Sequence, residues 1–273
     1  MFKVATFNAN SIRSRMHIIK RWIEKESPDV LAIQETKVVD ELFPKEEFNK
    51  IGYNVVFRGQ KAYCGVAIAS KWPIEDVQYG FDDEPKDEAR LIKAVIKGIP
   101  IVNTYVPQGK KIDHPDYQYK LHWFKRLRDF FSRHFSPDEP LLWVGDMNVA
   151  PTEIDITNPK TKLKHVDFHI DVRREFQKTL EWGFIDVFRK HKPNPGEFTF
   201  WDYRVPKAFE RNIGWRVDHI LATKPLADKS VDSYVDKEPR TWEKPSDHTF
   251  LVAIFDVQSR LSFCLKIICH GEH

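Results

Sequence analysis

Polar side chains that can bind a metal ion or transfer a proton follow several short apolar segments of this chain. Asp146 and Asn148 come directly after LLWVG, Glu35 follows VLAIQ, and Asp218 lies inside WRVDHILA. Strand ends hold side chains in stiff positions, and carboxylate and amide oxygens are the ligands that hard divalent cations prefer. An Asp-His pair at 247–248, before TFLVAIF, adds an imidazole that can handle a proton. This combination is typical of an enzyme that hydrolyses phosphate esters.

The GDMN segment is the most specific of these motifs. Gly145 permits a tight turn at the strand end, while Asp146 and Asn148, two residues apart, point to the same side of an extended backbone. In an ordinary turn, the same two side chains would cap their own backbone. Taken alone, the motif fits either interpretation.

The other polar groups are also ambiguous when each is taken singly. Neighbouring residues of an extended chain point to opposite faces, so Asp247 would need a bend to reach His248. Glu35 lies two residues before Lys37, and the two would form an ordinary exposed pair at a strand end. Asn8 is equally well explained as a turn residue.

The composition agrees with a globular enzyme built as one domain or as two closely packed halves. The chain has 273 residues, of which 41% are hydrophobic and 30% charged. No apolar stretch approaches the ~20 residues of a membrane span, and no charged-then-apolar leader opens the chain, so we expect an intracellular protein with no membrane contact. Three cysteines without CxxC spacing argue against a disulfide framework or a zinc site. The net charge of +3 permits a polyanionic partner without indicating one.

The elements that must position these groups alternate between strands and helices. Apolar periodicity and turn residues predict strands at 2–7, 30–34, 141–148, 198–203, 217–223 and 250–257, and helices at 17–26, 119–135 and 174–184. The β-rich segments between residues 53 and 101 are expected to form hairpins of one sheet. Two halves, each with strands and a flanking helix, favour two sheets packed face to face between helical layers.

In their order along the chain, the motifs resemble those of the exonuclease III family of apurinic/apyrimidinic endonucleases. They extend from Phe2 to about Val257 and are NxNSIR, QETK, YVPQG, GDMNVAP, FTFWDYR, GWRVDHIL and PSDH. The resemblance implies an α/β fold, the DNase I-like four-layer sandwich, in which two packed mixed β-sheets are flanked by helices. It implies a single catalytic domain over residues 1–257.

The same resemblance implies an activity and its requirements. These are Mg²⁺- or Mn²⁺-dependent hydrolysis of the phosphodiester 5′ to abasic sites in double-stranded DNA, with 3′→5′ exonuclease activity and trimming of damaged 3′ ends. We expect a monomer that acts in the cytoplasm and associates with the nucleoid through its DNA substrate.

The resemblance also assigns roles at the metal and the water. Glu35 would be the principal metal ligand, helped by Asn8 and by Asp247 or a second site near Asp146 and Asn148. Asp146 would orient or deprotonate the attacking water, and Asn148 would position the scissile phosphate.

Three further residues complete the predicted catalytic set. Asp218, rather than the adjacent Asp247, would hold or polarise the imidazole of His248. Tyr105 would contact the phosphate or stabilise the leaving oxygen. His248 would either stabilise charge on the phosphoryl oxygens or transfer a proton, and both roles stay open.

Aromatic and basic residues near these strand ends are candidates for binding DNA. Phe200, Trp201 and Trp215 correspond to the region where the family builds an apolar pocket for a deoxyribose that lacks its base. Basic side chains in the surrounding loops could bind backbone phosphates. The candidates are Lys37, Arg58, Lys111, Lys120 and Arg216.

Some features depart from the pattern or leave alternatives. Asn10-Ser11 stands where many relatives have a glycine-containing turn, and the tail at 258–273 lies beyond the matched motifs, as a packing appendage, an oligomer contact or an expression remnant. A phosphatase acting on inositol phosphates or lipid headgroups would share the acidic, GDxN and SDH motifs. A noncatalytic DNA-binding module on the same fold is a third alternative. FTFWDYR and GWRVDHIL favour the DNA-cleaving branch.

Overall fold

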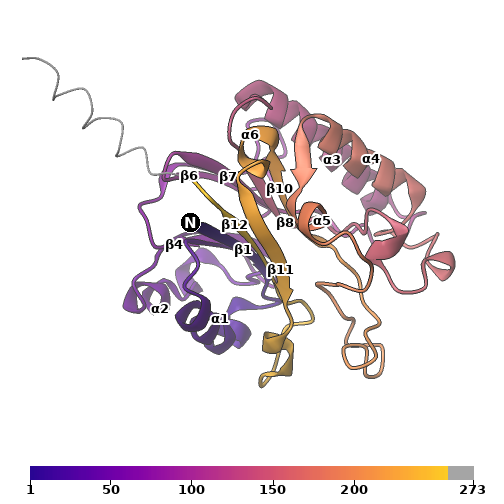
Figure 1. The fold of residues 1–273 in the computed structure, drawn as a ribbon, viewed down its shortest axis with the longest axis horizontal. Helices are drawn as coiled ribbons and strands as arrows, with labels where there is room; N and C mark the ends of the chain where they lie inside the picture. Colours follow the sequence, from indigo (N-terminus) through magenta and orange to yellow (C-terminus); the bar gives the residue numbers. More distant parts are fainter. Residues whose placement is uncertain (258–273) are drawn as a thin grey trace, which may run out of the picture.

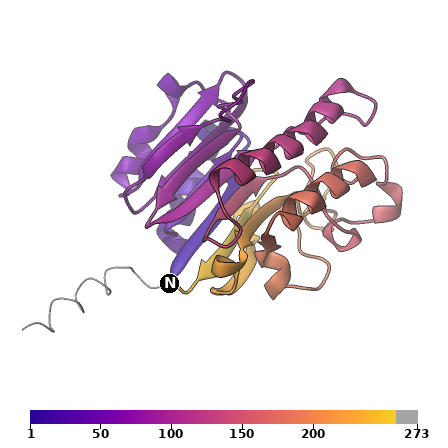
Figure 2. The ribbon, with the colours of Figure 1, turned by 90° about the horizontal axis from the view of Figure 1, so that it is seen from above.

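Two mixed β-sheets pack face to face, and helices cover both outer faces (Figures 1 and 2). The structure, a computed structural model, describes residues 1–257. The predicted tail at 258–273 lies outside the described residues. The expected α/β architecture of two packed mixed sheets flanked by helices is confirmed.

Each sheet has six strands with one parallel pair near its middle. The first sheet has the order β11-β12-β1-β2-β4-β3, with strands β1 Phe2–Asn8, β2 Val30–Gln34, β3 Asn54–Gln60, β4 Tyr63–Ser70, β11 Ser230–Asp236 and β12 Phe250–Phe255. The second has the order β5-β6-β7-β8-β10-β9, with strands β5 Glu75–Tyr79, β6 Leu91–Ile96, β7 Ile99–Tyr105, β8 Leu142–Asp146, β9 Phe184–Asp186 and β10 Asp218–Thr223. The parallel pairs are β1 with β2 and β7 with β8.

The helices complete the layers. Residues of α1 pack in the core on the outer face of the first sheet, and those of α3 and α4 in the core on the outer face of the second (Figure 1). The helices are α1 Ile12–Glu26, α2 Lys45–Lys50, α3 Pro115–His134, α4 Ile170–Glu181, α5 Val187–His191 and α6 Lys224–Ala227. Short 3-10 turns lie at Asp40–Leu42, Glu153–Asp155, Pro159–Thr161 and Glu238–Thr241. Among the helices of residues 1–257, none combines the length and apolarity that a membrane span requires.

The period-2 alternation of the strands explains the three large cores. Val4 and Val30 point into the core between the sheets, while Ala5 and Leu31 point to the core under α1. Because both faces are covered, every residue of β2 is buried.

Two predictions about strands are wrong. The segment from 53 to 101 does not form one sheet: β3 and β4 belong to the first sheet, and β5, β6 and β7 to the second. The alternation of a short strand does not indicate which sheet the strand joins. Periodicity therefore could not predict that the chain passes from the first sheet to the second near Pro73. The segment 198–203 is not a strand, because Phe200 forms only isolated bridges to Trp215 and His248.

The topology brings several strand ends to one edge of the two sheets. In the register of the strands, Asn8 lies beside Gln34, Tyr105 beside Asp146, and Asp218 beside Asp146. Strands β1, β2, β7 and β8 therefore end where β10 begins, and the polar residues that follow or open these strands meet at this edge.

Candidate active site

Several residues around the strand ends have backbone conformations that are rare for their residue types. Gly145 has φ +135°, and a Cβ there would lie 2.0 Å from the carbonyl oxygen of Thr104. Glu35, Lys37 and Asn148 have φ of +50°, +52° and +47°, a region that non-glycine residues rarely adopt. Such strain persists where the surrounding structure over-determines the backbone, and it clusters at functional sites.

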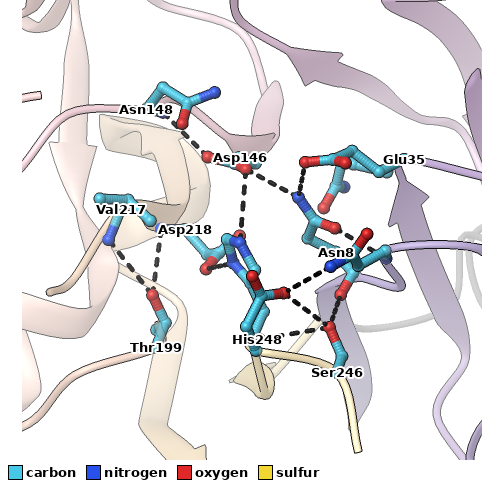
Figure 3. A network of polar contacts seen from close by, with 12 residues as sticks. Asn8, Glu35, Asp146, Asn148, Thr199, Val217, Asp218, Ser246 and His248 are labelled. Carbon is cyan, nitrogen blue, oxygen red and sulfur yellow. Dashed lines mark hydrogen bonds and ion pairs between the residues drawn. The ribbon is translucent and has the colours of Figure 1, made fainter. Parts of the chain in front are cut away.

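Glu35 and Asp146 are joined through the side chain of Asn8 (Figure 3). The Asn8 amide nitrogen donates to Glu35 Oε1 at 2.9 Å and to Asp146 Oδ2 at 2.9 Å. The amide oxygen of Asn8 accepts from the backbone N–H of Asn10 at 2.9 Å. The amide nitrogen of Asn8 thus holds the two carboxylates together, while its amide oxygen accepts from the backbone; its role as a metal ligand stays a prediction.

His248 takes its carboxylate partner from β10. Its Nδ1 lies 2.8 Å from Asp218 Oδ2, and its Nε2 lies 3.9 Å from Asp146 Oδ2 (Figure 3). Because a carboxylate only accepts, Nδ1 carries the proton in this pair. Asp247 is directed elsewhere, with its Oδ1 accepting from the Asn10 amide at 3.1 Å. The predicted contact of Asp218 with His248 is thus present.

Asp146, Asp218 and His248 form a tight buried group, with one ligand atom of each lying within 4.8 Å of the others. We call these three residues together with Glu35 the acidic cluster. Burial and the charge of Asp218 raise the pKa of Asp146. Burial opposes protonation of His248, but the charges of Asp218 and Asp146 outweigh it and raise the pKa of the imidazole.

Glu35 and Tyr105 stay in opposite protonation states. Burial raises the pKa of Glu35, but Lys37, whose Nζ lies 2.9 Å from Glu35 Oε2, and the hydrogen bond from Asn8 oppose it, and the pKa is below its usual value. The enclosed position of Tyr105, followed by the charges of Glu35 and Asp146, holds the pKa of its phenol well above the usual value. Tyr105 is therefore a neutral hydroxyl donor beside an ionised Glu35.

An apolar cluster lies beside the imidazole. The rings of Phe200 and His248 have centroids 4.8 Å apart, and Phe200 packs against a cluster that includes Trp215 and Phe168. Trp201 lies in a different cluster, is fully buried and donates from Nε1 to Asn212 at 3.2 Å. Of the three predicted pocket residues, Phe200 and Trp215 therefore lie together, and Trp201 is core.

Over residues 5–248, the chain matches the Endonuclease/Exonuclease/phosphatase family. The chain belongs to this family. Exodeoxyribonuclease III of Haemophilus influenzae is 35% identical over 266 residues, which cover 93% of this chain and 99% of that protein. A DNA-(apurinic or apyrimidinic site) endonuclease of Dictyostelium discoideum is 31% identical and shares 93% of this chain and 71% of its own length.

Solved structures of the family agree with the fold. An AP endonuclease from Archaeoglobus fulgidus is 55% identical with a TM-score of 0.93, and covers 94% of this chain and 100% of its own. The 3′-5′ exonuclease NExo from Neisseria meningitidis is 34% identical with a TM-score of 0.89 over the same shares. The predicted resemblance to exonuclease III is confirmed, and the chain is a hydrolytic nuclease of a metal-dependent family.

Two of the basic residues predicted to bind DNA in this family member are buried and fully occupied. Lys120 is 0% exposed and pairs with Asp167 at 2.9 Å. Arg216 is 1% exposed and pairs with Asp155 at 2.7 Å and Asp186 at 2.8 Å. Both predictions are wrong because these side chains turn inward, where their charges are matched by carboxylates.

The other predicted basic residues keep access to solvent. Lys111 is exposed, Arg58 is half-buried and pairs with Asp40 at 3.1 Å, and Lys37 donates to Asn10 Oδ1 at 2.6 Å as well as pairing with Glu35. Contact of these three with DNA stays a prediction.

Two hydroxyl residues that the sequence did not single out hold the site's backbone. Ser246 Oγ donates to the carbonyl of Asn8 at 2.8 Å, which ties the SDH turn to the end of β1. Thr199 Oγ1 accepts from the N–H groups of Val217 and Asp218, each at 3.2 Å (Figure 3). The signal for Ser246 was its place in PSDH; Thr199, inside an aromatic segment, carried none.

Proposed function

We propose that the chain hydrolyses the phosphodiester 5′ to abasic sites in double-stranded DNA, with 3′→5′ exonuclease activity and trimming of damaged 3′ ends. The observation that carries this proposal is the acidic cluster, in which three carboxylates and an imidazole meet at one sheet edge beside an apolar surface. The names of the relatives, an exodeoxyribonuclease III and AP endonucleases, support the same substrate class.

The cluster fits a hard divalent cation, for which we propose Mg²⁺ or Mn²⁺. Its available ligand atoms are carboxylate oxygens, and Asp218 Oδ1 is buried without a hydrogen-bond partner among the described residues. Glu35 and Asp146 would hold the ion, because the carboxylate of Asp218 is already paired with His248 Nδ1. A bound cation would neutralise charge on the phosphate and lower the pKa of Asp146.

Asp146 is positioned to serve the attacking water. Its Oδ1 accepts the N–H of Asn148 at 2.9 Å and its Oδ2 faces the Asn8 amide, so both oxygens have fixed directions. An ionised Asp146 can orient a water molecule and take its proton. Preorganised acceptors of this kind cost no reorganisation during the reaction.

Three side chains could donate hydrogen bonds to the phosphate and leaving oxygens as negative charge develops on them. His248 is held protonated by the two aspartates, and its Nε2–H is the group not used by Asp218. Tyr105 stays neutral and can donate its hydroxyl proton in a hydrogen bond. Asn148 presents an amide, one N–H of which is used by the carbonyl of Val106 at 2.8 Å. Groups aimed at developing charge lower the barrier electrostatically.

Selection of abasic DNA would come from the apolar surface of Phe200 and Trp215. An extrahelical sugar without a base costs little unstacking energy and can lie against such a surface, whereas a normal nucleotide is larger. Lys37, Arg58 and Lys111 would contact backbone phosphates. We further propose that the chain acts as a monomer, inside the cell, at the nucleoid where this substrate occurs.

The test is cleavage of an end-labelled duplex that contains one abasic site, with Mg²⁺, with Mn²⁺ and with a chelator. We expect a single incision 5′ to the abasic site that depends on the metal, followed by shortening from 3′ ends. A matched undamaged duplex controls for nonspecific cutting. Release of phosphate from inositol polyphosphates without cleavage of either duplex would overturn the proposal in favour of the phosphatase alternative, and metal-independent DNA binding without cleavage would favour the noncatalytic one.

A further inference from the structure

The ammonium group of Lys120 holds three loops at once. Its Nζ donates to the carbonyl oxygens of Asn148 at 2.6 Å, Val166 at 2.9 Å and Gln108 at 3.1 Å. It also pairs with Asp167 Oδ1 at 2.9 Å. These acceptors lie in the loops that follow β7, β8 and the 3-10 turn at Pro159–Thr161, so a single side chain from α3 connects the segments beside the acidic cluster.

His219 donates to the next carbonyl of the same turn. Its Nε2 lies 2.9 Å from the carbonyl oxygen of Val149, and its Nδ1 lies 3.2 Å from Arg216 Nη1. A guanidinium can only donate, so Nδ1 accepts and Nε2 carries the proton that is donated to Val149. Arg216 itself is fixed by Asp155 and Asp186, and the tautomer of His219 is therefore set by a buried ionic network.

The two carbonyls belong to Asn148 itself and to the next residue, Val149. Asn148 has φ +47°, its N–H donates to Asp146 Oδ1 at 2.9 Å, and its side chain donates to Val106 O at 2.8 Å. Asn148 is 8% exposed, so its amide has little freedom to search for a partner. The direction in which the amide faces the site depends on how the carbonyls at 148 and 149 are held.

We propose that Lys120 and His219 are positioning residues for Asn148 and Asp146, acting together as a carbonyl clamp on residues 148 and 149. The clamp rests on the proposed function, in which Asn148 meets the scissile phosphate. Its two donors come from different elements, α3 and β10, and hold successive carbonyls of one turn. A buried cation is costly unless carboxylates offset its charge. Asp167 does so for Lys120, and Asp155 and Asp186 do so for Arg216, which contacts His219.

The clamp is tested by removing each donor at nearly constant volume. Lys120→Met removes the ammonium, and Lys120→Met with Asp167→Asn removes both charges in case the single variant does not fold. His219→Phe removes the donor to Val149, whereas His219→Gln can still accept from Arg216 and donate to Val149. Lys125→Met is the matched control, because Lys125 lies on the same helix and pairs with Asp129 at the surface.

Steady-state cleavage of the abasic duplex with Mg²⁺ gives the first readout. We expect kcat to fall by about 10- to 100-fold in the Lys120 variants and in His219→Phe, with KM changed less than about threefold, because misplacement of a transition-state group lowers turnover without removing the binding surface. His219→Gln should recover most of the loss, and Lys125→Met should match the parent chain.

Amide hydrogen exchange of residues 147–150, measured without DNA or metal, gives a second readout that does not need activity. We expect faster exchange in His219→Phe and in the Lys120 variants than in the parent or in Lys125→Met. Parent-level kcat and unchanged exchange in folded variants, with only a lower Tm, would show a purely structural role and overturn the clamp. If the parent chain itself does not cut abasic DNA, the proposed function fails, and the exchange result still decides whether residues 147–150 are clamped.

Discussion

Two of the buried groups of charges within residues 1–257 differ in how the charges are balanced. In the acidic cluster, Glu35, Asp146 and Asp218 face one imidazole, and of these three carboxylates Lys37 pairs with Glu35. In the second group, which we call the arginine network, Asp155 and Asp186 face Arg189 and Arg216. One group has an excess of negative charge, and the other is matched.

The same residue type behaves in opposite ways in the two groups. Burial and Asp218 raise the pKa of Asp146, whereas burial at Asp155 is outweighed by Arg216 and Arg189, which hold the pKa of that carboxyl well below its usual range. Both carboxyls are buried, so burial alone does not determine the direction in which either pKa is shifted. In a matched network, removal of one charge leaves its partner buried and uncompensated, while an unmatched cluster is suited to bind a cation and exchange a proton.

Replacing Asp146 by Asn gives the largest expected effect. We expect kcat on abasic DNA to fall by about a thousandfold, because the carboxylate that serves the water is lost, while duplex binding stays measurable. In the metal-free protein, the free energy of unfolding should be equal or higher, because burial and Asp218 disfavour the charged form of Asp146 and an amide carries no charge. The checks are single-turnover cleavage, a binding titration and chemical denaturation.

His248→Ala is the companion variant. It removes the only cation of the buried carboxylate pair, so both turnover and stability should fall. Near-parent turnover in either variant would contradict the roles given to these residues, and a strongly destabilised Asp146→Asn would contradict the contrast with the arginine network.

Replacing Asp155 by Asn tests the other side of the comparison. Asp155 accepts from Arg216, Arg189 and Thr152, and an asparagine leaves the guanidinium groups short of negative charge. We expect a loss of roughly 3–5 kcal/mol in the free energy of unfolding, as for other broken buried pairs. Denaturation by urea measures it, and Asp129→Asn at the surface, which should change stability little, is the control.

Much of the site could be predicted because its chemistry requires particular residue types at strand ends. Glu35, Asp146 and Asp218 were recognisable from their places after or within apolar segments. Strand geometry argued against Asp247 as the partner of His248, and the family resemblance supplied Asp218. The sheet edge in the structure joins these residues.

The remainder depended on tertiary contacts that no local pattern encodes. Lys120 and Arg216 have the sequence appearance of DNA-binding residues, but their partners Asp167, Asp155 and Asp186 are distant in the chain and pull them inward. The orientation of the Asn8 amide is likewise set by Glu35 and Asp146, from two other strands. Which sheet each short strand joins was also decided by long-range packing.

The dependence of stability on pH tests the effect of the arginine network on its neighbour His219. Burial, followed by Arg216, lowers the pKa of His219 to about 4, although Asp186 and Asp155 oppose the shift. Because the folded pKa lies below the usual 6.5, the unfolded chain binds the extra proton, and stability is lost as pH falls from 6.5 towards 4.

The expected slope from His219 alone approaches about 1.4 kcal/mol per pH unit in that window. Denaturation curves at several pH values measure it. His165 also has a lowered pKa, from burial, so the informative quantity is the difference between the parent and His219→Gln. Parallel profiles for the two proteins would show that His219 does not titrate with folding.

A divalent metal ion should stabilise the acidic cluster, which has an excess of negative charge, and not the arginine network. At ten times its dissociation constant, Mg²⁺ that binds the folded chain alone adds about 1.4 kcal/mol to the free energy of unfolding, a rise in Tm of roughly 3–6 °C. Glu35→Gln and Asp146→Asn should lose most of this rise, because each removes a charge from the acidic cluster. Asp155→Asn should keep the full increment although its baseline Tm is lower, since the arginine network supplies its own cations. An equal metal-induced shift in all these variants would mean that Mg²⁺ binds elsewhere, and the charge imbalance of the acidic cluster would then need a different explanation.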